Sequence, residues 1–204
     1  WRLRLRVAVP CIVLTAVVSV GLGNALSRDV VHIDLVGSAN APAVVVTQND
    51  TAVVLFRGGN SVRNAVEEQL ARRGAGKIEL LVDLRTKPET PCALEADQSV
   101  LAEEMSVNTA QKQKCRPALV EVLRTRNGCL VRLTIGEQQF VTVSGTVTLA
   151  EPVRAQWLLA SPAKPEAVQW EQLLSRSDHY QWMQGGEAVY ASLSLRPSGG
   201  WRAE

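Results

Sequence analysis

The most apolar stretch of the chain lies close to its N-terminus. Twenty residues without a charge run from Val7 to Leu26, and at helical rise they cover about 30 Å, the thickness of a bilayer's hydrocarbon core. Arginines flank this stretch, three before it and one after it, and such a bias places the preceding flank in the cytoplasm. The pattern predicts a transmembrane helix with a basic cytoplasmic flank over residues 1–28, with a signal peptide or a buried core helix as alternatives.

Short apolar runs with a period of two follow this stretch. Residues 30–36 form one such run, and residues 43–60 contain two β-branched runs on either side of a polar turn, which is typical of a hairpin. Residues 61–74 carry apolar side chains at helical spacing. The next run, 78–84, is almost continuously apolar and predicts a strand buried on both faces. Strand, hairpin, helix and strand in this order indicate an α/β fold.

The second half repeats part of this pattern. Residues 85–118 are polar and irregular, and we expect a short helix within them, from Ala93 to Met105. The segment 129–145 then echoes 43–59, since each has an apolar run, a polar turn, an apolar run and a glycine. This echo predicts a duplicated fold with one sheet from each half and with the two hairpins in facing sheets. The remaining pattern predicts a strand at 156–160, a helix at 165–175 and a strand at 188–195.

The charge of the chain is unevenly distributed. The formal net charge is +2, but residues 1–28 contain four arginines and no acidic residue, which leaves the remaining 176 residues with a net charge of −2. The apparent basicity therefore belongs to the predicted membrane flank. A mildly acidic body offers no continuous cationic surface for nucleic-acid phosphates.

Few side chains are suited to metal or nucleophilic chemistry. The chain has two histidines, His32 and His179, and four cysteines without a CxxC pair, which argues against a histidine-rich metal centre, a zinc ribbon and a thioredoxin-type motif. Ser177-Asp178-His179 has the residue types of a hydrolase triad, but we expect a surface turn there, because sequence neighbours do not assemble a triad. His32 and Asp34 share one face of a predicted strand, where local hydrogen bonding is expected. The tryptophans of the last quarter are expected in the core: Trp157, Trp170, Trp182 and Trp201.

Several segments, taken in order, resemble the C-terminal metallo-β-lactamase-like domain of ComEC-type DNA-internalisation competence proteins. IDLVGSAN is similar to that family's LDVGQGDA, TAVVLFRGG to its LIDGG hairpin end, and LARRGAGKIELLV to its basic helix end and following strand. NGCLVRLTIGEQQFVTVSG is similar to its later hairpin, which ends in TGD, and AQWLLASP to its final ligand strand. The resemblance covers nearly the whole chain. It implies an αββα sandwich over residues 29–204, with two facing mixed sheets and outer helices.

The same resemblance implies that the metal site has degenerated. The family's THxHxDH loop directly follows the buried strand, and here its ligand positions hold Arg85, Lys87, Glu89 and Thr90, while the TGD aspartate aligns with Thr146. Two cations at these positions would repel metal ions by several kcal/mol, on the order expected at a low effective dielectric. The LIDGG aspartate aligns with Arg57. The resemblance thus implies a pseudoenzyme that holds no metal and no other cofactor.

A disulfide is a further implication of the resemblance and of the expected location. Cys92 and Cys115 flank the segment where the family's metal loop and its insert would lie, and an extracytoplasmic body permits disulfides. A bridge between them would contribute on the order of 3 kcal/mol to stability through loop closure.

Three functions remain open at this point. The first is a non-catalytic domain of a cell-membrane DNA-uptake protein, with its globular part on the extracytoplasmic side, serving as a scaffold or contacting single-stranded DNA beside an upstream polytopic channel domain. The second is a membrane-anchored interaction domain unrelated to DNA uptake. The third is a divergent metal-dependent nuclease built around Asp34, Asp83 and Glu89.

Overall fold

The computed structural model describes residues 30–38, 42–147, 153, 155–159, 177–181, 188–196 and 200–203. Within these residues no helix combines the length and the apolarity needed to cross a membrane. The predicted span at 1–28 and the predicted helix at 165–175 lie outside the described residues.

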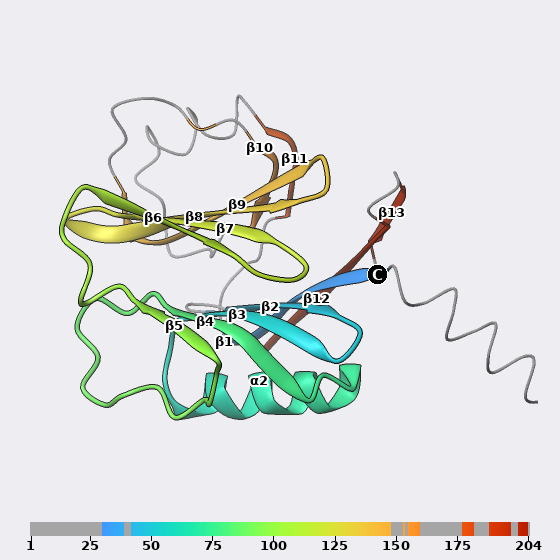
Figure 1. Cartoon of the computed structure of the whole chain (residues 1–204), viewed down its shortest axis with the longest axis horizontal. Helices are drawn as coiled ribbons and strands as arrows, with labels where there is room; N and C mark the ends of the chain where they lie inside the picture. The colour runs from blue at the N-terminus through green and yellow to red at the C-terminus, as the bar shows by residue number, and fades with distance from the viewer. Residues whose placement is uncertain are drawn as a thin grey trace, which may run out of the picture.

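Two β-sheets face each other, and one helix lies against the outer side of the larger sheet (Figure 1). The larger sheet has seven strands in the spatial order β13 (Gly200–Ala203), β12 (Ala188–Arg196), β1 (Val31–Ser38), β2 (Ala43–Gln48), β3 (Thr51–Phe56), β4 (Lys77–Asp83) and β5 (Gln98–Leu101). The smaller sheet has six, in the order β11 (Ser177–Gln181), β10 (Ala155–Leu159), β9 (Gln138–Thr146), β8 (Asn127–Ile135), β7 (Leu119–Arg124) and β6 (Thr109–Lys114). The helix is α2 (Asn60–Arg73).

Both sheets are mixed, as the sequence resemblance implied. β3, β4 and β5 run parallel, and so do β9, β10 and β11, whereas the other neighbours are antiparallel. The hairpin expected at 43–59 lies in the larger sheet and the one expected at 129–145 lies in the smaller sheet. The prediction of two facing sheets is therefore confirmed. Of the outer helices, the described part contains α2.

The larger sheet takes strands from both ends of the chain, which corrects the expectation of one sheet from each half. β12 pairs with all eight residues of β1, from Val31 opposite Leu195 to Ser38 opposite Ala188. The backbone groups of β1 on this side need partners, because unpaired buried N–H and C=O groups are costly. The late strand satisfies them, and β13 then pairs with β12.

Two local predictions are wrong. The short helix expected from Ala93 to Met105 is absent, and Gln98–Leu101 form β5, which runs parallel to the end of β4. The turn expected at Ser177-Asp178-His179 is part of β11, which pairs with β10. In both cases an open strand edge overrides weak local preferences, because pairing satisfies backbone groups that would otherwise lack partners.

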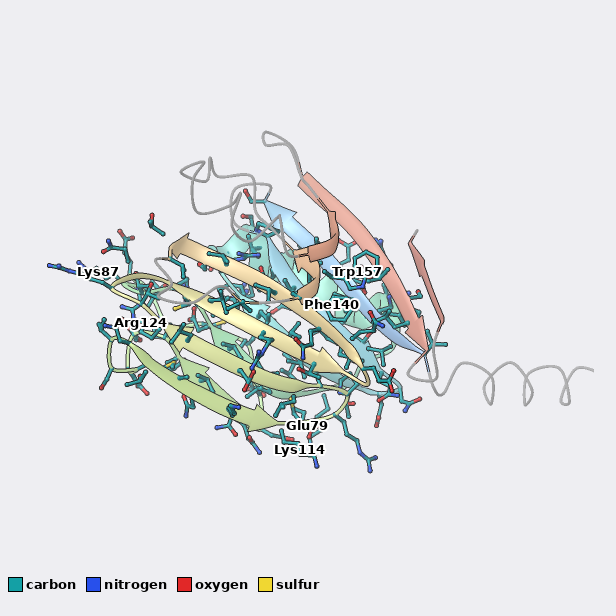
Figure 2. All side chains as sticks on the ribbon, turned by 90° about the horizontal axis from the view of Figure 1, so that it is seen from above. Glu79, Lys87, Lys114, Arg124, Phe140 and Trp157 are labelled. Carbon is teal, nitrogen blue, oxygen red and sulfur yellow. The ribbon has the colours of Figure 1, made fainter. Side chains whose placement is uncertain are left out.

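The main core lies between the sheets. Its fully buried members include Ile33 and Leu55 from the larger sheet and Leu133 from the smaller one. Phe140 of β9 stacks on Trp157 of β10, with ring centroids 6.0 Å apart and an interplanar angle of 15° (Figure 2). The expectation of a core role is thus confirmed for Trp157. The side chains of the other three late tryptophans lie outside the described part.

A second core joins α2 to the outer face of the larger sheet. Val62, Val66 and Leu70 recur at helical spacing, and all three pack against the strands. Gly74 ends the helix with φ of 69°, a left-handed conformation that suits glycine. The spacing of apolar positions therefore predicts both the helix and its buried face.

Two glycines let β8 and β9 approach closely. Gly128 lies opposite Gly145 in the register. A Cβ on Gly128 would lie 2.3 Å from the Ser144 carbonyl oxygen, and one on Gly145 would lie 2.5 Å from the Asn127 carbonyl oxygen. Gly145 also has φ of 73°. The close approach of β8 and β9 therefore requires glycine at both positions.

We predict that Gly145→Ala lowers the free energy of unfolding by about 2 kcal/mol or more, because alanine meets both an unfavourable φ and a backbone atom. Gly76→Ala is the control, since nothing lies within 4 Å of a Cβ at Gly76; its effect should stay within about 1 kcal/mol. Urea titration followed by circular dichroism measures both. Equal stability of the two variants would contradict the prediction.

Candidate functional site

The loop that the sequence resemblance aligns with metal ligands begins with an ion pair between Asp83 and Arg85. Asp83 is the last residue of β4 and its side chain is 5% exposed. The Arg85 guanidinium binds it in a fork, with Nη2 2.6 Å from Oδ2 and Nε 2.9 Å from Oδ1. The Arg85 backbone N–H also donates to Oδ1, at 3.1 Å. Both oxygens of the Asp83 carboxylate therefore accept hydrogen bonds from Arg85, two residues further along the chain.

Contacts with the end of β3 hold the first residues after β4 in place. The Leu84 N–H donates to the Phe56 carbonyl oxygen at 2.8 Å, which continues the β3–β4 pairing by one residue. Arg85 then lies over the Phe56 ring, with its guanidinium carbon 5.1 Å from the ring centroid. The hydrogen bond with Asp83 raises the pKa of Arg85 above its usual range, against a smaller lowering by burial. The guanidinium therefore stays charged.

The other predicted loop positions do not converge on Asp83. Lys87, Glu89 and Thr90 are exposed, and Figure 2 shows Lys87 extending away from the molecule. Thr146 is exposed at the end of β9, opposite Asn127. Sequence placed Arg85 correctly after the buried strand, but it gave no indication that Arg85 would bind Asp83.

The residues at this position do not fit a metal centre. Asp83 already accepts the Arg85 fork, and a cation at this distance opposes a second positive charge. In the described part of the chain, no three His, Cys, Asp or Glu side chains come together in an arrangement that could hold a metal ion. The arrangement provides a fixed positive charge beside Asp83.

Arg57 is a second buried arginine, and it connects the two sheets. It follows β3 directly and is 4% exposed. Nε donates to the Pro42 carbonyl oxygen at 2.6 Å, Nη2 donates to Thr142 Oγ1 at 2.9 Å, and Nη1 donates to the Val143 carbonyl oxygen. Burial lowers the pKa of Arg57 to about 10, so the group remains protonated at neutral pH.

Asp34 is a buried acid that fastens α2 to β1. It is 0% exposed and accepts hydrogen bonds from Arg73 Nη2 at 2.7 Å, from Arg73 Nε at 2.9 Å and from Gln69 Nε2 at 2.8 Å. On the same strand, His32 Nδ1 lies 2.9 Å from Ser194 Oγ of β12. These contacts agree with the expected local hydrogen bonding.

The arrangement of strands separates the three acids of the nuclease hypothesis. Asp34 lies on β1 and Asp83 on β4, with β2 and β3 between them. Three strand spacings amount to about 14 Å, which is too far for two carboxylates to share one ion. Glu89 is exposed in the loop after β4. The nuclease site proposed from sequence is therefore not assembled.

A cavity of about 540 Å³ lies beside the ends of β4 and β5. Asp83, Glu95, Glu103 and Cys92 are among the residues that line it. Burial raises the pKa of Cys92, so the thiol is a weak nucleophile at neutral pH. The described residues that line the cavity include no histidine, so the bases available in the lining are carboxylates.

Cys92 and Cys115 are free thiols, so the bridge expected between them is not formed. Cys92 lies near Asp83, at the end of β4. Cys115 lies near Thr51, which pairs with the first residue of β4. Seven strand residues separate these ends by about 20 Å, whereas a disulfide needs Cα atoms within about 7 Å.

Comparisons with known proteins find similarity only among solved structures. No family model and no curated protein matches the chain. The metallo-β-lactamase fold protein YhfI from Bacillus subtilis is similar with a TM-score of 0.49 and 8% identity, over 79% of this chain and 100% of that one. MEM-A1, a subclass B3 metallo-β-lactamase from a soil metagenome library, has a TM-score of 0.39 and 13% identity, over 72% and 74%. A protein of unknown function from Enterococcus faecalis V583 has a TM-score of 0.36 and 8% identity, over 64% and 49%.

We predict that Arg85→Met lowers the free energy of unfolding by about 3 kcal/mol, because it leaves the Asp83 carboxylate buried without its cation. The double variant with Asp83→Asn should lose less than the sum of the single changes, with a coupling energy of about 1–3 kcal/mol. Arg72→Met is the matched control, since the Arg72–Glu68 pair is exposed and should change stability by less than about 1 kcal/mol. Thermal and urea unfolding measure all four. A loss for Arg85→Met no larger than for Arg72→Met would refute the role of the pair.

Proposed function

We propose that this chain is a non-catalytic metallo-β-lactamase-like domain of a ComEC-type membrane protein of DNA uptake, where it serves as a scaffold or as a contact for the incoming strand. The observation that carries the proposal is the Arg85–Asp83 ion pair directly after β4. In the resemblance that the sequence suggests, this loop holds metal ligands. Here it holds a guanidinium on the carboxylate.

The chemistry of hydrolysis supports a non-catalytic role. Metal-dependent phosphodiester cleavage uses ions held by carboxylates and imidazoles, which activate water and stabilise the charge that develops on the phosphate. Arg85 can bind an anion, but it cannot lower the pKa of a bound water as a divalent ion does. The domain would therefore hold or guide a strand without cutting it.

Exposed cations at one end of the molecule are the candidates for contact with DNA. Many other basic side chains are occupied within the body, as Arg73 is by Asp34 and Lys77 by Asp97. Lys87 and Arg126 are exposed, and no ion pair described in the structure involves either. Figure 2 shows Lys87 and Arg124 at the same end, and Arg126 lies in the turn that follows Arg124. A strand bound here would pass the loop that follows β4, which contains Lys87.

We predict that the purified chain, after incubation with Zn²⁺ or Mn²⁺ and removal of free metal, retains far less than one ion per chain and cleaves no DNA. Elemental analysis and a nuclease assay on single- and double-stranded substrates measure the two outcomes. Asp83→Ala is the control, because any cleavage that survives it arises elsewhere. Stoichiometric metal with cleavage abolished by Asp83→Ala would overturn the proposal.

We further predict weak binding to an oligo(dT) probe that falls steeply with salt, because phosphate contacts release counterions. The double variant Lys87→Glu and Arg126→Glu should reduce the affinity at low salt at least about tenfold. Fluorescence anisotropy at two salt concentrations measures both. Absence of binding at low salt would favour the alternative of a membrane-anchored interaction domain unrelated to DNA uptake.

A further inference from the structure

The smaller sheet ends in a strand whose outer edge is open in the described part. β6 pairs with β7 on one side only. The Cys115 N–H donates to the Ala118 carbonyl oxygen at 3.1 Å, which sets the alternation of the ladder. By that alternation the backbone groups of Ala110, Lys112 and Lys114 face away from β7. The edge therefore presents N–H and C=O groups to a further strand.

A row of alternating charges ends at this edge. Lys112, Glu121 and Arg132 lie side by side on β6, β7 and β8. Glu121 forms ion pairs with both cations. Although burial raises it, the hydrogen bonds from Lys112 and Arg132 bring the pKa of Glu121 below its ordinary range. The signs run plus, minus, plus, so a strand added beside Lys112 would continue the pattern with a carboxylate.

Exposed apolar side chains flank the same strand. Among the described residues, the large hydrophobic side chains that are exposed are Val107, at 49%, and Leu119, at 36%. Val107 precedes β6 by two residues, and Leu119 lies opposite Lys114 at its other end. Figure 2 shows Lys114 at the margin of the molecule, well away from Lys87 and Arg124. The edge of β6 thus has lysines along the strand and an exposed apolar side chain near each end.

We propose that β6 binds an extended acidic segment of a partner protein by strand addition. Backbone hydrogen bonds to Ala110, Lys112 and Lys114 would give affinity, as in other strand-addition complexes. Carboxylates beside Lys112 and Lys114 would give the preference for acidic sequences. The surface is distinct from the end of the molecule proposed to contact DNA.

The charges disfavour other occupants. A second copy of the chain would bring the two lysines of one β6 close to those of the other, and such edge lysines oppose pairing between copies. A nucleic-acid strand could bring phosphates to the two lysines, but it has no regularly spaced N–H and C=O groups to pair with the backbone of β6. An acidic peptide alone complements both the lysines and the exposed backbone groups.

The test uses the whole chain and a fluorescent peptide, Leu-Thr-Glu-Thr-Glu-Thr-Val, with blocked ends. We expect saturable binding by anisotropy, weakened at least about tenfold by Ala110→Pro, which removes an outward N–H without removing a bond to β7. Lys114→Glu should weaken it about five-fold or more at low salt. Arg72→Glu, on α2 against the other sheet, should leave it unchanged.

A second measurement keeps the proposal testable if Ala110→Pro does not fold. Hydrogen exchange of the unmodified chain should slow at Ala110, Lys112 and Lys114 when the peptide is added, and a peptide methylated on alternate backbone nitrogens should not bind. Absence of binding, or binding unaffected by Lys114→Glu, would overturn the proposal. So would displacement of the peptide by oligo(dT), or a concentration-dependent dimer that Ala110→Pro abolishes. Peptide binding, its loss in Lys114→Glu and the slowed hydrogen exchange are all measured without DNA, so they succeed or fail independently of the proposed function.

Discussion

The relation between the two sheets depends on Arg57. Apolar packing between sheets is strong but non-directional, and the many valines and leucines of this core could accommodate shifts of one sheet against the other. Arg57 removes that freedom, because a buried guanidinium requires acceptors in defined directions. It takes one acceptor from the carbonyl of Pro42, beside its own sheet, and two from Thr142 and Val143 of the opposite one. This contact therefore fixes the end of β3 relative to β9.

Two further arginines use the same principle at other boundaries. Arg73 joins the end of α2 to Asp34 on β1, and Arg85 joins the loop after β4 to Asp83. In each case a cation that is part of the chain satisfies a carboxylate that the sheet buries. Where a metal ion fulfils such a role, the fold gains stability only when the ion is bound. Arginines make the charge permanent, so this body can keep its shape without any exchangeable ion. The proposal of a non-catalytic scaffold rests on this property.

The elements that were predicted from sequence are those with a clear pattern of hydrophobic residues within the element itself. The β2–β3 and β8–β9 hairpins follow from β-branched runs, and α2 follows from the spacing of Val62, Val66 and Leu70. β5 and β6 are short or polar, and only the open edges of β4 and β7 determine that they pair. The site shows the same division. The order of residues along the chain predicted that Arg85 follows β4. Two of the three acceptors of Arg57, however, lie on a strand about 85 residues away, and nothing in the local sequence indicates them. The expected bridge between Cys92 and Cys115 is not formed, because the two residues lie near opposite ends of β4. Their spacing along the chain does not indicate that distance.

Buried and exposed cations therefore act differently in this molecule. The buried arginines fix the relation of one element to another, since each meets a complete set of acceptors inside the fold. Lys112 and Lys114 lie at an edge whose backbone groups have no partner strand among the described residues, and their charge decides which strands can pair there. An edge without them would pair with any extended chain, including further copies of itself. The alternation of charge from Lys112 through Glu121 to Arg132 makes the same edge selective, because only a strand that supplies the next negative charge completes the row.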